Sequence, residues 1–271
     1  MPTLSISQIT TRKWPFERDV DYFSRLGIAA MGVLKGKLEE YGTEGGIRLL
    51  RDSGLKTSCY QPGDRFAVDD PACWPERLDT LKRGLETARR LGASCLMLLT
   101  GPAGPISYEE AAKRFLEQLG ELLPAAREAG VPIALESHIS LRIDVTFVHR
   151  LHDVLDLVEA VDSPDFGACC EVTHVFPERG FYQNLRERTG RLLHVQTGDF
   201  RPGTVATSER VPLGEGIIDF PRVFQTLDEG GYDRYLELEL LGPEIEALGY
   251  EEAIRRSLAY MEGIGAERWG L

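Results

Sequence analysis

The sequence predicts an α/β protein, a single-domain (β/α)8 TIM barrel that spans residues 1–271. Short apolar segments alternate eight times with longer segments whose apolar residues recur at the helical period. Strict alternation implies parallel strands joined by right-handed crossovers, and eight such units in 271 residues suit a closed barrel. An open doubly wound sheet is the alternative, but no G-x-G-x-x-G motif follows the first strand. The expected strands are residues 3–9, 28–34, 55–60, 94–99, 131–136, 165–171, 191–196 and 234–240.

Capping residues indicate where several helices begin and end. Ser107 and Glu110 form a capping box ahead of an apolar stripe, and Gly130 follows the same helix. We expect Thr146 to begin the helix that precedes the sixth strand. Asp219 is expected to begin the helix that precedes the eighth.

Composition and charge limit the partners of the protein. The chain is 42% hydrophobic and 27% charged, and its formal net charge is −12. This charge disfavours nucleic acid and anionic membrane surfaces, because binding to phosphates depends on Lys and Arg. The sequence shows no secretory signal and no apolar run long enough to span a membrane, and its five cysteines form no C-x-x-C pair. A cytoplasmic protein with reduced thiols is therefore expected, and a homo-oligomer stays open.

Polar side chains end four successive predicted strands. Glu136 ends the fifth strand, Glu171 the sixth and Gln196 the seventh, and Glu239 lies near the end of the eighth. The active site of a (β/α)8 barrel lies at the C-terminal ends of its strands, so these side chains are expected at one mouth. Crowded carboxylates repel one another, and a divalent cation removes that repulsion. The pattern therefore predicts a metal site, although a lone strand-end glutamate is more often a solvated or capping residue.

Four segments carry a resemblance to a known family, VPIALESH, GACCEVTH, HVQTGDF and GEGIIDFPRVFQTLDEGGYDRYLELE. They resemble the xylose-isomerase-like TIM barrel family of sugar isomerases and epimerases, which includes hydroxypyruvate isomerase-like and dehydroshikimate dehydratase-like members. The resemblance implies one divalent metal held by Glu136, Glu171, Gln196 and Glu239. The family commonly has Asp in place of Glu171 and His in place of Gln196. Because all four donors here are oxygens, Mn²⁺ or Mg²⁺ is expected rather than Zn²⁺.

The resemblance also suggests residues that contact the substrate. His174 matches the histidine of the family's D-x-x-H motif and is expected to contact substrate oxygens or to move a proton; a loop histidine bonded to backbone is the alternative. Arg201 follows the seventh strand where relatives place a substrate-binding arginine, but it could instead pair with Asp199. His138 is expected beside the substrate, where it and His194 could orient carboxylates.

These residues together suggest an activity. By resemblance, Glu136 and Glu239 lie on opposite sides of the substrate as base and acid. We expect a metal-dependent isomerase or epimerase of carbohydrate metabolism, acting on a small polyhydroxy carbonyl compound through an enediolate. The alternative is a dehydratase or lyase acting on a keto-inositol or dehydroshikimate-like substrate; a non-catalytic binding protein or an abasic-site endonuclease is less favoured. Glu237, one layer deeper than Glu239, is expected to hold a lysine, an arginine or a water.

Overall fold

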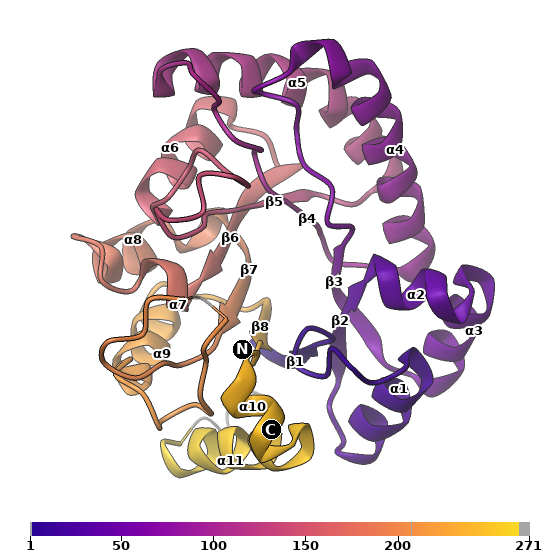
Figure 1. Ribbon diagram of the computed structural model, residues 1–271, viewed down its shortest axis with the longest axis vertical. Helices are drawn as coiled ribbons and strands as arrows, with labels where there is room; N and C mark the ends of the chain where they lie inside the picture. Colours follow the sequence, from indigo (N-terminus) through magenta and orange to yellow (C-terminus); the bar gives the residue numbers. More distant parts are fainter. Residues whose placement is uncertain (1, 207, 266–271) are drawn as a thin grey trace.

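Eight parallel strands close into a barrel in chain order, with helices around them (Figure 1). The computed structural model describes residues 2–206 and 208–265. Strand β1 pairs with both β2 and β8, so the sheet has no free edge and the open-sheet alternative is wrong. The strands are β1 Thr3–Ser7, β2 Ala30–Leu34, β3 Lys56–Gln61, β4 Leu96–Leu98, β5 Ile133–Glu136, β6 Phe166–Glu171, β7 Leu192–Thr197 and β8 Tyr235–Leu238.

The helices form the outer layer and connect successive strands (Figure 1). The Ser107 side chain accepts a hydrogen bond from the Glu110 amide, and the Asp219 side chain accepts one from the Arg222 amide, so both residues are confirmed as N-caps. The Glu110 carboxylate pairs with Arg114 at 3.1 Å, so only the Ser107 half of the predicted capping box is seen among the described residues. The α-helices are α1 Phe16–Arg25, α2 Lys35–Tyr41, α3 Thr43–Ser53, α4 Trp74–Leu91, α5 Tyr108–Ala129, α6 Leu151–Val161, α7 Val172–Val175, α8 Phe181–Glu187, α9 Phe220–Glu229, α10 Pro243–Leu248 and α11 Tyr250–Gly263, with 3-10 turns η1 Pro71–Cys73 and η2 Thr189–Arg191. None of these helices is both long and apolar enough to cross a membrane, as far as the described residues show.

The prediction that Thr146 begins a helix is wrong. Helix α6 begins at Leu151, and Thr146 lies in the preceding loop, where its hydroxyl is 2.8 Å from that of Thr100. The carboxylate of Glu178 caps α6 instead, accepting hydrogen bonds from the Leu151 amide at 2.8 Å and from the His152 amide at 3.3 Å. A carboxylate brought in from a later loop satisfies the free amides of the first turn, so no local cap is needed.

The inside of the barrel is lined by small and polar side chains. Side chains on a strand alternate between its two faces, and Leu96, Leu98 and Ile133 pack outward against the helices in the main core. The inward residues form a separate small cluster of Cys59, Cys95, Met97, Ala134, Cys169 and Leu193. Within the described residues, all five cysteines are free thiols; four are buried and Cys73 is exposed. The cysteine and alanine side chains of this cluster leave room inside the barrel for polar groups.

Candidate active site

The four predicted strand-end residues gather at the C-terminal mouth of the barrel. Glu171 and Gln196 are partners in the β6–β7 register, and the Gln196 amide nitrogen lies 2.6 Å from Glu239 Oε2. Glu239 follows β8 directly, and its backbone amide donates to the Thr197 carbonyl at 2.8 Å, which continues the strand pairing by one residue. Glu136 ends β5 with its side chain 15% exposed. A single period-2 pattern on four adjacent strands thus delivers all four groups to one place.

A buried arginine that the sequence patterns did not mark holds two of these carboxylates. Arg210 Nη1 lies 3.0 Å from Glu171 Oε2 and 3.3 Å from Glu239 Oε1, and it donates to the Glu239 carbonyl at 2.8 Å. Arg210 comes from the long loop between β7 and α9, where no hydrophobic periodicity predicts a buried side chain. The only sign of a buried arginine in the sequence is indirect: three carboxylates at neighbouring strand ends need a positive charge close to them.

The arginine predicted to bind substrate lies elsewhere on the same loop. The guanidinium of Arg201 is 49% exposed and pairs with Glu244 at 2.6 Å and Glu215 at 3.5 Å. The alternative pairing of Arg201 with Asp199 is wrong, since the buried Asp199 carboxylate accepts four backbone amides of its own loop. Arg210, rather than Arg201, is therefore the arginine that contacts the carboxylates of the mouth.

Burial and mutual repulsion raise the pKa of two glutamates at the mouth. Burial raises the pKa of Glu136 well above its usual range, and the nearby charges of Glu239 and Glu171 raise it further. Burial also raises the pKa of Glu239, to about 8, although Arg210 opposes the shift. A pKa of about 8 lets Glu239 take up and release a proton near neutral pH, which is the property that a general acid or base needs.

Two stacked histidines stand beside Glu136. The rings of His138 and His174 lie 4.0 Å apart between centroids, and burial is the main reason that the pKa of each is lowered to about 3, so both are neutral. His174 Nδ1 lies 3.1 Å from the Ser137 carbonyl and 3.4 Å from Glu136 Oε1. Because a carbonyl can only accept, Nδ1 carries the proton and Nε2 is left with its lone pair. The buried Nε2 has no hydrogen-bond partner among the described residues.

Glu237 lies one layer below the mouth and is fully buried. It accepts hydrogen bonds from Ser58 at 2.7 Å, Gln196 at 3.1 Å and Ser5 at 3.3 Å. Glu237 therefore holds hydroxyl and amide groups in place of the lysine or arginine that we expected, and the expectation of a water stays a prediction. Burial by itself would raise the pKa of Glu237, but His194 and these donors outweigh it and the pKa is lowered.

The charges and donors of the mouth fit a divalent cation. Glu136, Glu171 and Glu239 carry three negative charges when ionised, and Arg210 supplies one positive charge, which leaves two negative charges uncompensated. Carboxylate oxygens are the ligands preferred by hard divalent ions. Gln196 here turns its amide nitrogen toward the glutamates, so it serves as an oxygen ligand only after its amide rotates by half a turn.

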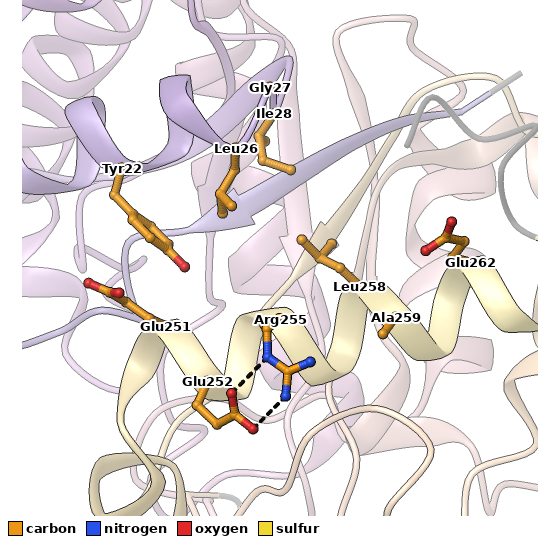
Figure 2. Close-up of a pocket in the computed structure, with 10 residues that line it drawn as sticks. All are labelled: Tyr22, Leu26, Gly27, Ile28, Glu251, Glu252, Arg255, Leu258, Ala259 and Glu262. Carbon is orange, nitrogen blue, oxygen red and sulfur yellow. Dashed lines mark hydrogen bonds and ion pairs between the residues drawn. The ribbon is translucent and has the colours of Figure 1, made fainter.

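A pocket on the outer layer is separate from this mouth (Figure 2). It has a volume of about 750 Å³ and lies between the end of α1 and α11, with Tyr22, Arg255 and Leu258 in its wall. Leu26 and Ile28, which also line it, lead into the N-terminal end of β2. Since barrel enzymes react at the opposite ends of the strands, we do not assign the chemistry to this pocket.

Comparison with known proteins identifies the family. Residues 20–263 match the model of the xylose isomerase-like TIM barrel family, and the chain belongs to it. A curated relative, L-ribulose-5-phosphate 3-epimerase UlaE of Escherichia coli O139:H28 (strain E24377A / ETEC), is 25% identical over 196 residues, which are 69% of this chain and 65% of that protein. The match thus spans less than two thirds of the relative's length.

Solved structures show the same barrel. Protein SMc04130 from Sinorhizobium meliloti 1021 is 25% identical and superposes with a TM-score of 0.82, over 93% of this chain and 98% of that one. IolI, solved with a bound zinc atom, is 23% identical with a TM-score of 0.85 over 98% of both chains. D-psicose 3-epimerase from Clostridium cellulolyticum H10, solved with D-tagatose, is 14% identical with a TM-score of 0.79, over 99% of this chain and 100% of that one. At this identity the last two show a common fold.

Proposed function

We propose that this protein is an isomerase or epimerase of a small polyhydroxy carbonyl compound, a sugar or a ketose derived from one. One observation carries the proposal: the carboxyl groups of Glu136 and Glu239 lie at the same barrel mouth, beside Glu171 and the buried Arg210. Both reactions move a proton between substrate and protein, and both need such groups. The family and the curated epimerase relatives support the same class of reaction.

Glu136, Glu171, Gln196 and Glu239 would hold one divalent ion in this proposal. Their oxygen donors favour Mn²⁺ or Mg²⁺. When bound, such an ion polarises the substrate carbonyl and so acidifies the adjacent C–H bond. The zinc in the IolI structure supports a divalent metal in this fold, without deciding which metal serves this chain.

The residues of the chain then have distinct tasks. The ionised carboxyl group of the Glu136–Glu239 pair removes the proton next to the carbonyl, and the protonated one returns a proton to the resulting enediolate. His174 Nε2, with its free lone pair, accepts a hydrogen bond from a substrate hydroxyl. Arg210 holds the Glu239 backbone carbonyl and the Glu171 side chain, so both glutamates keep their positions while protons move. Return of a proton to the opposite face of the same carbon gives an epimer, and return to the neighbouring carbon gives an isomer.

Hydrogen exchange with solvent tests this proposal. We expect a panel of ketoses, hydroxypyruvate, keto-inositols and dehydroshikimate to contain a compound that takes up deuterium beside its carbonyl in D₂O, as followed by proton NMR. Glu136→Gln should abolish the uptake. Glu246→Gln, which alters a surface carboxylate paired with Lys13 at 2.6 Å, should leave it unchanged.

Two outcomes would contradict the proposed chemistry. The first is exchange that continues at the wild-type rate in Glu136→Gln. The second is conversion of a substrate deuterated beside its carbonyl with complete retention of the label on the neighbouring carbon, even in slow variants, because that pattern indicates a hydride shift. Loss of a β-hydroxyl after exchange would instead redirect the assignment to a dehydratase.

A further inference from the structure

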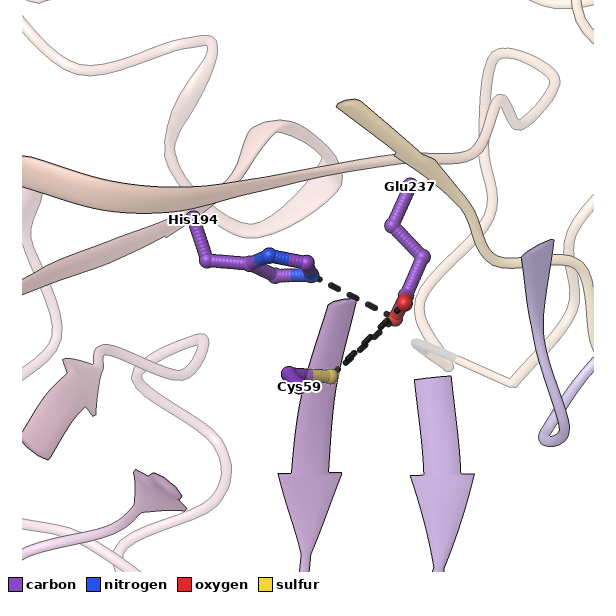
Figure 3. A group of neighbouring side chains, drawn as sticks. All are labelled: Cys59, His194 and Glu237. Atoms are coloured by element: carbon purple, nitrogen blue, oxygen red, sulfur yellow. Dashed lines mark hydrogen bonds and ion pairs between the residues drawn. The ribbon is translucent and has the colours of Figure 1, made fainter. Parts of the chain in front are cut away.

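A second group of ligand-type side chains converges inside the barrel, below the mouth (Figure 3). Cys59 comes from β3, His194 from β7 and Glu237 from β8, and all three are fully buried. Among the described residues they form a group of metal-ligating side chains whose donor atoms all lie within 4.8 Å of one another. Figure 3 shows the thiol and the imidazole both pointing at the Glu237 carboxylate.

The distances within this group suit tetrahedral coordination. Zinc bonds of about 2.3 Å to sulfur and about 2.0 Å to nitrogen or oxygen place neighbouring ligands roughly 3.5 Å apart for S···O and roughly 3.3 Å apart for N···O. In the structure, Cys59 Sγ lies 3.7 Å and 3.6 Å from the two oxygens of Glu237, and His194 Nε2 lies 3.5 Å from Oε1. These contacts with Glu237 are thus within a few tenths of an ångström of ligand spacing, and the thiol and imidazole donors lie within 4.8 Å of each other.

His194 gives an independent sign that a ligand is missing. Its side chain is completely buried, yet neither ring nitrogen has a hydrogen-bond partner among the described residues. Buried polar atoms in folded proteins are nearly always paired, and an unpaired one costs about 1–3 kcal/mol. The 3.5 Å contact of Nε2 with Glu237 is too long for a good hydrogen bond. A cation between the two groups would give Nε2 a partner.

The surrounding backbone makes room for the carboxylate. A Cβ atom on Gly32 would lie 2.3 Å from Glu237 Oε2, so any side chain on β2 at this point would expel the carboxylate. The amide groups of Gln61 and Gln196 also reach Glu237 Oε1, at 3.4 Å and 3.1 Å. The amide oxygen of Gln61, after rotation of the amide, or a water is available as a fourth ligand, since Gln196 is assigned to the mouth.

We propose that Cys59, His194 and Glu237 bind a divalent ion of the zinc class inside the barrel, separate from the all-oxygen site of the mouth. A thiolate and an imidazole favour zinc or cobalt over magnesium or manganese. Binding transfers the thiol proton of Cys59 to solvent, because the thiolate is the ligand. The ion ties β3 to β7 and β8 across the barrel and so stabilises the folded state by mass action.

Cobalt spectroscopy tests the site. Protein produced in cobalt-supplemented medium should retain cobalt and show thiolate-to-cobalt charge-transfer absorption in the near ultraviolet. Cys59→Ser should lose this band completely. Cys95→Ser should keep it, because Cys95 is equally buried in the same inner cluster but its thiol faces the Ser58 carbonyl at 3.9 Å. Cobalt in the mouth has only oxygen ligands and gives no such band, so the two sites are distinguished.

Three results would overturn the proposal: protein that retains no cobalt, cobalt bound without the thiolate band, or a band that persists in Cys59→Ser. If Cys59→Ser does not fold, X-ray absorption on wild-type protein produced with zinc decides the question. One sulfur neighbour at about 2.3 Å from zinc is expected. A shell of nitrogen and oxygen alone, or no retained zinc, would refute the site without any variant.

Discussion

Replacing Arg210 by methionine tests whether this buried guanidinium holds the mouth together. Methionine keeps much of the length and apolar contact of the side chain, but it cannot replace the contacts with Glu171 at 3.0 Å and with the Glu239 carbonyl at 2.8 Å. The Arg210 side chain is 2% exposed and that of Glu171 is fully buried, so water cannot substitute for the lost partner. Removing one member of such a pair typically costs about 3–5 kcal/mol.

Protonation sets a ceiling on this cost. Protonating a carboxyl group with an ordinary pKa of about 4.3 costs about 3.7 kcal/mol at pH 7. If burying one unpaired carboxylate costs more than this, the group takes up a proton instead, so the destabilisation from that carboxylate does not exceed about 3.7 kcal/mol. We therefore expect Arg210→Met to lower the free energy of unfolding by about 3–4 kcal/mol at pH 7. For a chain of this size that is a fall in Tm of roughly 6–16 °C. At pH 5 the same protonation costs only about 1 kcal/mol, so the loss should be clearly smaller.

The sign of the pH effect follows from linkage. Without the guanidinium, the buried Glu171 carboxylate has no compensating charge, so the folded variant binds a proton there more readily than the unfolded chain does. The destabilisation is therefore larger at high pH and shrinks as the pH falls and protonation becomes less costly. Equilibrium urea unfolding at pH 7 and pH 5 measures both quantities.

A double-mutant cycle and a matched control complete the test. Glu171→Gln combined with Arg210→Met should cost at least about 2 kcal/mol less than the sum of the single changes, because the two side chains act on each other. Arg201→Met, on the same loop but 49% exposed, should cost no more than about 1 kcal/mol. A loss below about 1 kcal/mol for Arg210→Met, equal losses at both pH values, or strict additivity would refute the reasoning.

Three further changes probe a buried loop carboxylate, a buried ion pair between helices α1 and α2, and the ligands of the mouth. Asp199→Asn should lower the free energy of unfolding by about 2–4 kcal/mol in urea titrations, because an amide group then faces backbone N–H donors that the carboxylate now accepts. Asp19→Ala should cost about 3–5 kcal/mol by thermal unfolding, since Lys37 would be left buried without its partner, and a loss under about 1 kcal/mol would contradict the pairing. Titration calorimetry with Mn²⁺ should show one ion per chain in wild-type protein and none at the mouth in Glu136→Gln; unchanged binding in that variant would remove Glu136 from the ligand set.

The barrel and the positions of the mouth glutamates were available from the sequence because both depend on short-range periodicity. A short apolar run predicts each strand. The alternation of side chains along a strand then decides whether a side chain points into the barrel or toward the helices. Glu136 and Glu171 end their strands in the structure as expected, and Glu239 extends β8 by one residue beyond Leu238. The closure of the sheet then brings these ends together, whatever lies in the connecting loops.

Contacts between distant loops were decided only by the tertiary structure. Helix α6 starts at Leu151 because Glu178, far along the chain, caps it, and no residue near Thr146 could reveal that contact. Arg210 reaches the mouth from a loop without periodicity, whereas Arg201, closer to the strand, stays at the surface. An arginine side chain is buried at the mouth because the buried carboxylates there have lost their hydration and need a positive charge. That free energy arises only once the barrel has closed around the carboxylates.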